Sequence, residues 1–169
     1  MSWTLRMLAV SALALVGLTT SADDTKPFDD GEFLMNVASC DMCEIELGKL
    51  ASEKARNEDV KKFAKKLTED HQKCLEDLKT VAKSAGVTLP EKMKDEQRKI
   101  CDKFKDYKGE NFDRDYIKQM VEGHEKAVKS FTRATKEAKA QEVKDFATKG
   151  LPVLQAHLEE AKKLQEQLK

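Results

Sequence analysis

The sequence has few residues that break helices, and it carries no net charge. It contains three prolines and seven glycines in 169 residues, and 31 basic residues balance 31 acidic ones. Scarce proline and glycine, together with abundant Lys, Glu, Ala and Leu, favour an all-helical fold. Basic and acidic residues are interspersed and form no basic patch, which argues against a nucleic-acid partner.

The only long apolar run lies at the N-terminus. Residues 7–18 are largely apolar, follow Arg6, and end just before Thr20-Ser21-Ala22, small residues of the kind that a signal peptidase reads. The run is short for a bilayer span, so we expect cleavage and no stable membrane insertion afterwards; an uncleaved anchor is the alternative. The expected product is exported to the periplasm or cell envelope, or is secreted. The expected organisation is a signal peptide at 1–22, an N-terminal linker at 23–30 and one helical domain at 31–169.

Hydrophobic periodicity predicts four long helices and one short amphipathic segment. Asp29 with Glu32 resembles a capping box, and Asn57 is a typical N-cap residue. The second of the three connections is long and the other two are tight. This spacing predicts an all-α, ferritin-like antiparallel four-helix bundle with one long crossover containing a short helix. The long helices are expected at about 29–55, 58–85, 111–139 and 141–168, and the short one within 93–107.

A faint internal repeat supports two related helical hairpins. Val60-Lys-Lys-Phe-Ala in the second long helix is similar to Val143-Lys-Asp-Phe-Ala in the fourth. Lys, Ala and Phe patterns also recur by chance, so the repeat is a minor indication.

The three histidines give the strongest functional signal. On helical wheels, at roughly 100° per residue, His71, His124 and His157 each lie in the middle of the apolar stripe of a different helix. Glu44 has the same place in the first helix. In an antiparallel hairpin, residues equidistant from the turn lie level, as Glu44 and His71 do, and as His124 and His157 do. We therefore expect all four side chains to converge on one layer.

These side chains suit a metal ion. A carboxylate buried in a bundle core is costly unless a cation neutralises it. Imidazole nitrogens and a carboxylate are ligands for iron, zinc, manganese or copper. The leading hypothesis is a single transition metal ion bound by Glu44, His71, His124 and His157, with Asp70 as an outer acceptor that orients the His71 ring. The alternative is a metal-free Glu–His network in the core.

The four cysteines admit three interpretations. Cys40 and Cys43 form a C-x-x-C pair, but it lies well inside a helix, away from the N-terminus that lowers thiol pKa, and no second pair completes a zinc site. Cys40 lies level with Cys74, and Cys43 is placed to reach Cys101 in the crossover. Two disulfides are the leading interpretation, since an exported protein meets an oxidising compartment; thiolate metal ligands and a redox pair are the alternatives.

Six motifs follow one another between about 33 and 161. They are Glu44-Ile-Glu-Leu-Gly-Lys-Leu-Ala, Glu69-Asp-His71, Gly86-Val-Thr-Leu-Pro90, Phe112-Asp-Arg-Asp-Tyr116, His124-Glu-Lys-Ala-Val and Leu151-Pro-Val-Leu-Gln-Ala-His157. Jointly they resemble a family of exported bacterial proteins of the ferritin-like superfamily that is known only as a domain of unknown function. The resemblance implies a four-helix bundle and a signal peptide, but no established activity.

The di-iron members of that superfamily carry Glu-x-x-His pairs, whereas Thr68 and Leu154 stand three residues before His71 and His157 here. A carboxylate-rich di-iron centre is therefore not expected. No nucleophile, phosphate-binding loop or second carboxylate joins the four candidate ligands, so no enzymatic activity is assigned. We expect metal handling or protection from oxidants; the alternative is a non-catalytic envelope or stress protein that binds partners on its surface.

Overall fold

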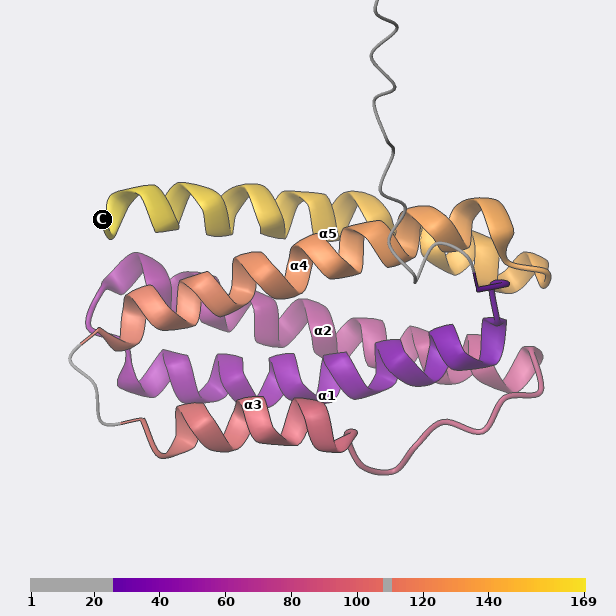
Figure 1. Cartoon of the computed structure of the whole chain (residues 1–169), viewed down its shortest axis with the longest axis horizontal. Coiled ribbons are helices and arrows are strands. Elements are labelled where there is room, and N and C mark those ends of the chain that lie inside the picture. The colour runs from indigo at the N-terminus through magenta and orange to yellow at the C-terminus, as the bar shows by residue number, and fades with distance from the viewer. Residues whose placement is uncertain (1–25, 108–110) are drawn as a thin grey trace, which may run out of the picture.

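The computed structural model describes residues 26–107 and 111–169, and over these ranges it contains five helices and no strand. The predicted signal peptide lies outside the described residues. The antiparallel four-helix bundle with one long crossover and a short helix is confirmed (Figure 1). The helices are α1 (Asp30–Lys54), α2 (Glu58–Ser84), α3 (Asp95–Lys105), α4 (Phe112–Glu137) and α5 (Gln141–Gln167).

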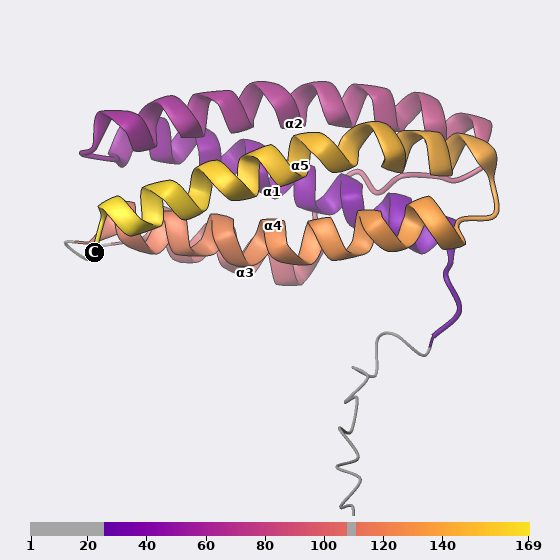
Figure 2. The ribbon, with the colours of Figure 1, turned by 90° about the horizontal axis from the view of Figure 1, so that it is seen from above.

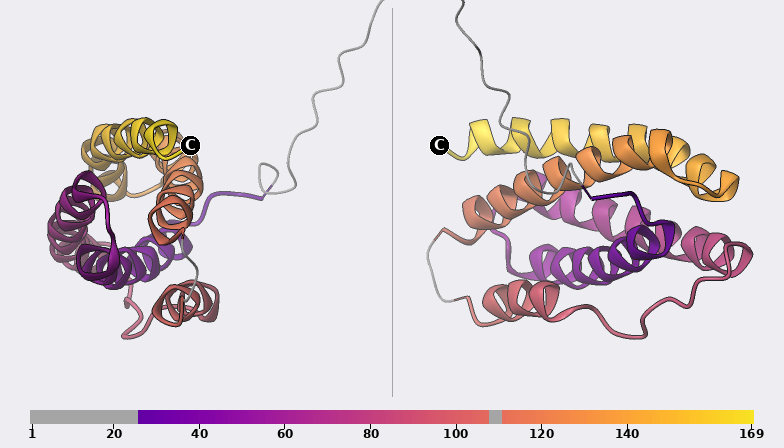
Figure 3. Two further views of the ribbon diagram at one scale, coloured as in Figure 1. Left: turned by 90° about the vertical axis from the view of Figure 1, so that its left-hand side faces the viewer. Right: turned by 45° about the vertical axis from the view of Figure 1, so that its right-hand side comes forward.

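The four long helices surround a common axis as two hairpins, α1–α2 and α4–α5 (Figure 2). Seen along the bundle, α3 lies outside this ring (Figure 3, left), and α1 is the helix against which it packs. The α1–α2 turn and the α4–α5 turn stand at opposite ends of the bundle (Figure 1). No helix in the described part of the chain has the length and apolar character needed to cross a bilayer.

The apolar core falls into two clusters. One contains Leu47, Phe63 and Leu67 and extends toward the α1–α2 turn. The other contains Phe33 and Leu78 and extends toward the α4–α5 turn. Between the two clusters, the apolar stripes of the helices are interrupted at one level by polar side chains. This polar layer is where a functional site can form.

Local capping explains where the first two long helices begin. The Asp29 side chain accepts a hydrogen bond from the Glu32 N–H, at 2.7 Å, as the capping-box pattern predicts. The Asn57 side chain accepts from the N–H groups of Asp59 and Val60. Each cap satisfies amide groups that the first turn of a helix leaves without partners.

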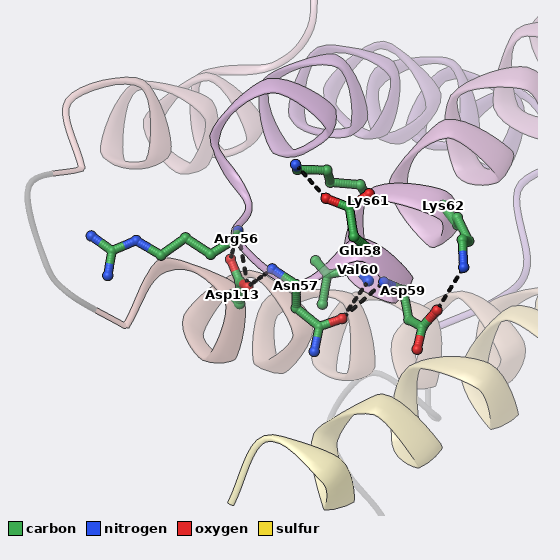
Figure 4. Close-up of polar contacts among 8 residues, drawn as sticks. All are labelled: Arg56, Asn57, Glu58, Asp59, Val60, Lys61, Lys62 and Asp113. Carbon is green, nitrogen blue, oxygen red and sulfur yellow. Dashed lines mark hydrogen bonds and ion pairs between the residues drawn. The ribbon is translucent and has the colours of Figure 1, made fainter.

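Each hairpin also holds the turn of the other hairpin. Asp113, in the first turn of α4, accepts hydrogen bonds from the N–H groups of Arg56 and Asn57 in the α1–α2 turn, the shortest at 2.7 Å (Figure 4). Asp30, in the first turn of α1, accepts in the same way from Lys139 and Ala140 in the α4–α5 turn. Because both sets of hydrogen bonds link different hairpins, they fix the position of one hairpin along the other.

The same 83 residues separate Asp30 from Asp113 and Val60 from Val143. The cross-hairpin hydrogen bonds therefore recur at the spacing of the faint sequence repeat, and the two hairpins are built alike.

Replacing Asp113 with Ala should lower the free energy of unfolding by about 1–2 kcal/mol, because two turn amides lose a charged acceptor. Asp95, which lies in the first turn of α3 and is exposed, is the matched control. Asp95→Ala should change stability by less than about 0.5 kcal/mol. Urea denaturation of both variants measures the difference; equal losses would show that Asp113 acts through its helix terminus alone.

Candidate metal centre

Three histidines from three helices meet in the polar layer between the two core clusters. His71 comes from α2, His124 from α4 and His157 from α5, and these residues are 6%, 2% and 1% exposed. The ring centroids are 5.4–5.8 Å apart. One nitrogen of each ring lies within 4.8 Å of one nitrogen of each other ring. Histidines at this depth need partners, because a buried polar nitrogen without a hydrogen bond is costly.

The outer nitrogen of each ring has an acceptor. His71 Nδ1 is 2.8 Å from Asp41 Oδ1, and His157 Nε2 is 2.8 Å from Asp70 Oδ2. His124 Nδ1 is 2.9 Å from the backbone carbonyl oxygen of Met120, one turn earlier in α4. A carbonyl oxygen only accepts, so His124 carries its proton on Nδ1. Carboxylates fix the other two rings in the same way, with the proton on the outer nitrogen.

The inner nitrogens are left as bare acceptors. His71 Nε2, His124 Nε2 and His157 Nδ1 are buried and have no hydrogen-bond partner. Because the outer nitrogens hold the protons of neutral rings, the inner nitrogens carry lone pairs, and three lone pairs cannot satisfy one another. A metal ion, a proton on one ring or a hydrogen-bond donor such as water would satisfy these buried acceptors.

Burial and the surrounding charges shift the pKa values of the three histidines in different directions. Burial lowers the pKa of His124 to about 3, with repulsion from His71 adding to the effect. Burial also lowers the pKa of His157, and the hydrogen bond that the ring donates to Asp70 opposes this effect. Burial acts against the charged form of His71 too, but the hydrogen bond and charge of Asp41 outweigh it and raise the pKa of that ring. His124 and His157 thus stay neutral near pH 7, and His71 is the ring that accepts a proton.

Glu44 is half-buried, and its Oε2 atom is buried without a partner. Burial raises its pKa to about 7, an effect that the nearby His71 counteracts. Its Oε1 atom lies against Gly123 of α4, at 3.4 Å from the position that a Cβ would take there. The carboxylate thus borders the centre but does not belong to the group formed by the three histidines. Of the four predicted residues, the structure brings the three histidines together, and Glu44 lies beside them.

The acceptors differ from those expected on the sequence. Asp70 orients His157 from across the bundle, so the prediction that it holds His71 is wrong. The acceptor for His71 is Asp41, which is 3% exposed and was not predicted. Asp41 precedes Glu44 by three residues and so shares its helix face. This spacing is the feature of the sequence from which the inward position of Asp41 could have been inferred.

A cavity of about 800 Å³ opens onto this centre. It lies between the two hairpins and is bordered by residues from all five helices. All three histidines and Glu44 line it, and Phe131, Phe146 and Leu154 give it apolar walls. The histidine centre is therefore reached through space inside the bundle.

All four cysteines are free thiols in this structure. The Cys43 and Cys101 Sγ atoms are 3.0 Å apart, whereas no bond or hydrogen bond joins Cys40 to Cys74. Burial raises the pKa of Cys40 to about 12 and raises that of Cys74 further. A reactive Cys40-x-x-Cys43 thiolate pair has no support from these pKa directions.

The chain matches the family described as "Domain of unknown function (DUF4142)" over residues 17–164, and it belongs to that family. The comparison with curated proteins gives no match.

Solved structures share the fold. CopM in the Cu(II)-bound form is 18% identical with a TM-score of 0.71, and the match covers 85% of this chain and 100% of that one. CopM in the Cu(I)-bound form is 19% identical with a TM-score of 0.68, covering 83% and 97%. A DUF305 fragment from Deinococcus radiodurans is 12% identical with a TM-score of 0.70, covering 84% and 99%. The TM-scores show a common helical-bundle fold, and at identities this low the likeness extends to the fold alone.

The depressed pKa of His124 makes a prediction for the metal-free protein. Between pH 6.5 and about 3, the unfolded chain binds a proton at this residue that the folded chain excludes, so acidification removes stability there. Relative to His124→Leu, the unmutated protein should lose up to about 1.4 kcal/mol per pH unit below pH 6.5.

Urea denaturation of both proteins at pH 7 and pH 5, with a chelator present, measures this difference. A difference that does not change with pH would mean that His124 is not a buried neutral ring.

Proposed function

We propose that this member of the DUF4142 family binds one transition metal ion through His71 Nε2, His124 Nε2 and His157 Nδ1. The observation that carries the proposal is the set of three buried inner nitrogens without partners, each on a ring whose outer nitrogen is already bonded. Bonding at the outer nitrogen fixes the tautomer and raises the basicity of the ring as a ligand. A metal ion would supply the electron-pair acceptor that the three lone pairs lack.

Copper is the metal we favour. Imidazole ligands suit copper, zinc, iron and nickel, and divalent copper binds nitrogen ligands most tightly among the first-row ions. Solved structures with the same fold are described as copper-bound and silver-bound forms of CopM. Three neutral imidazoles give the ion no compensating charge, so nearby carboxylates matter. Asp41 and Asp70 supply charge through the rings, and Glu44 supplies it directly beside the centre.

The role we propose is metal handling outside the cytoplasm, by sequestration that also limits damage by oxidants. The signal-like pattern of residues 1–22 supports export. The cavity next to the histidines supports exchange of the ion with the surroundings, since a route into the centre already exists. The rival is a metal-free structural core in which the proton on His71 bridges the three rings.

One equivalent of Cu(I) or Cu(II) should bind per chain at pH 7, and His157→Leu should weaken binding by more than the roughly 10–100-fold typical of losing an outer partner. Competition with a chelator of known affinity, read by elemental analysis, measures both. The matched control is a variant with all four cysteines changed to Ser, which should bind the ion as the unmutated protein does.

Loss of binding in the cysteine-free variant, with His157→Leu unaffected, would assign the metal to the thiols instead. No stoichiometric metal in the unmutated protein under any supplement would favour the metal-free core.

Asp70 should act on the metal only through His157. Asp70→Ala should weaken metal binding by about 10-fold or more, because the ring loses the acceptor that fixes its tautomer. Asp77→Ala is the matched control: Asp77 is on the same helix, lines the same cavity and has no bond to a histidine. The same affinity loss in both variants would show that Asp70 contributes charge to the cavity and no orientation.

A further inference from the structure

A pair of buried thiols joins the crossover helix to the bundle. Cys43 of α1 is 5% exposed, Cys101 of α3 is 1% exposed, and their Sγ atoms are 3.0 Å apart. The two residues are 58 positions apart in the sequence. The distance between the two sulfur atoms is shorter than in ordinary van der Waals contact, and about 1 Å longer than a disulfide bond.

The surroundings favour a neutral product of this pair. Mutual hydrogen bonding with Cys101, and then burial, raise the pKa of the Cys43 thiol far above its ordinary value. The charge of Glu44 and the Cys40 thiol add to the effect. Two thiolates holding a monovalent ion such as Cu(I) would leave a net charge of −1 in the core, whereas a disulfide carries no charge.

We propose that Cys43 and Cys101 form a disulfide bond in the mature protein. The bond forms by two thiol–disulfide exchanges with a small disulfide such as oxidised glutathione. One cysteine, as thiolate, attacks a glutathione sulfur, forms a mixed disulfide and releases one glutathione thiol. The second cysteine then attacks the protein sulfur of the mixed disulfide, forms the Cys43–Cys101 bond and releases the second glutathione thiol. The two cysteines are oxidised, and one glutathione disulfide is reduced to two thiols.

The bond would add a covalent link to the contacts that hold α3 on the bundle. α3 packs mainly on α1, and its Phe104 ring also contacts Phe112 and Tyr116 of α4. Glu96, Gln97 and Ile100 of α3 form part of the wall of the cavity that leads to the histidines. The disulfide therefore holds one wall of that cavity against α1. This consequence is independent of which metal the histidines bind.

Two double variants separate the two cysteine pairs. Cys40→Ser/Cys74→Ser keeps only Cys43 and Cys101, and Cys43→Ser/Cys101→Ser keeps only Cys40 and Cys74. Both are exposed, metal-free, to oxidised glutathione, denatured, alkylated and weighed by mass spectrometry. Thermal unfolding and hydrogen exchange of residues 95–105 are then compared before and after reduction.

The Cys40→Ser/Cys74→Ser variant should show no free thiol, a mass about 2 Da lower than the reduced form, and no attached glutathione. Reduction should lower its thermal midpoint by roughly 10 °C, as expected for a bond closing a long loop, and should speed exchange in α3 while leaving α5 unchanged. The Cys43→Ser/Cys101→Ser variant should keep two alkylated thiols, or carry attached glutathione, and show neither shift.

Two free thiols in the Cys40→Ser/Cys74→Ser variant would overturn the proposal, as would glutathione attached to one of them. Met93 Sδ lies 3.8 Å from Cys101 Sγ, so three sulfur atoms are close together. Tight binding of Ag(I) or Cu(I) by this variant even after exposure to oxidised glutathione, abolished by Met93→Leu, would also overturn it and identify a soft-metal site instead.

Discussion

The hydrogen bonds on the outer nitrogens of three buried histidines control what the centre of this bundle can hold. Asp41, Asp70 and the Met120 carbonyl oxygen accept hydrogen bonds from the outer ring N–H groups, so the lone pairs of neutral rings point inward. If one of these acceptors were missing, its ring could turn or change tautomer, and the inner nitrogen could donate to its neighbour. The three inner nitrogens are therefore directed toward one another in the middle of the bundle, where they are buried and have no hydrogen-bond partner.

The two hairpins are alike in their packing and differ at this centre. At the same 83-residue spacing, Phe63 corresponds to Phe146, and both are buried in the core. Asp41 corresponds to His124, and Cys74 to His157. One hairpin therefore provides two of the histidines, while the other provides His71 and its acceptor. Because of this asymmetry the chain has one three-histidine centre, although the two hairpins around it pack alike.

The site also depends on how the hairpins are aligned along the bundle axis. The bonds from Asp30 and Asp113 to the opposite turns act at the two ends, and the histidines lie between them. An error of one helical turn in this alignment would move a ring by roughly 5.4 Å and separate the three nitrogens. The hydrogen bonds at the bundle ends therefore also determine whether the three histidines meet in the middle.

The sequence determined the helices, the caps at Asp29 and Asn57, and the presence of three histidines on buried stripes, because each follows from local periodicity. Only the tertiary structure decided which carboxylate serves which ring, and that Glu44 stands beside the three histidines instead of among them. A helical wheel fixes the direction of a side chain to within a face. Hydrogen bonds are decided by one or two ångströms between helices, and that distance depends on how all the side chains in the core pack.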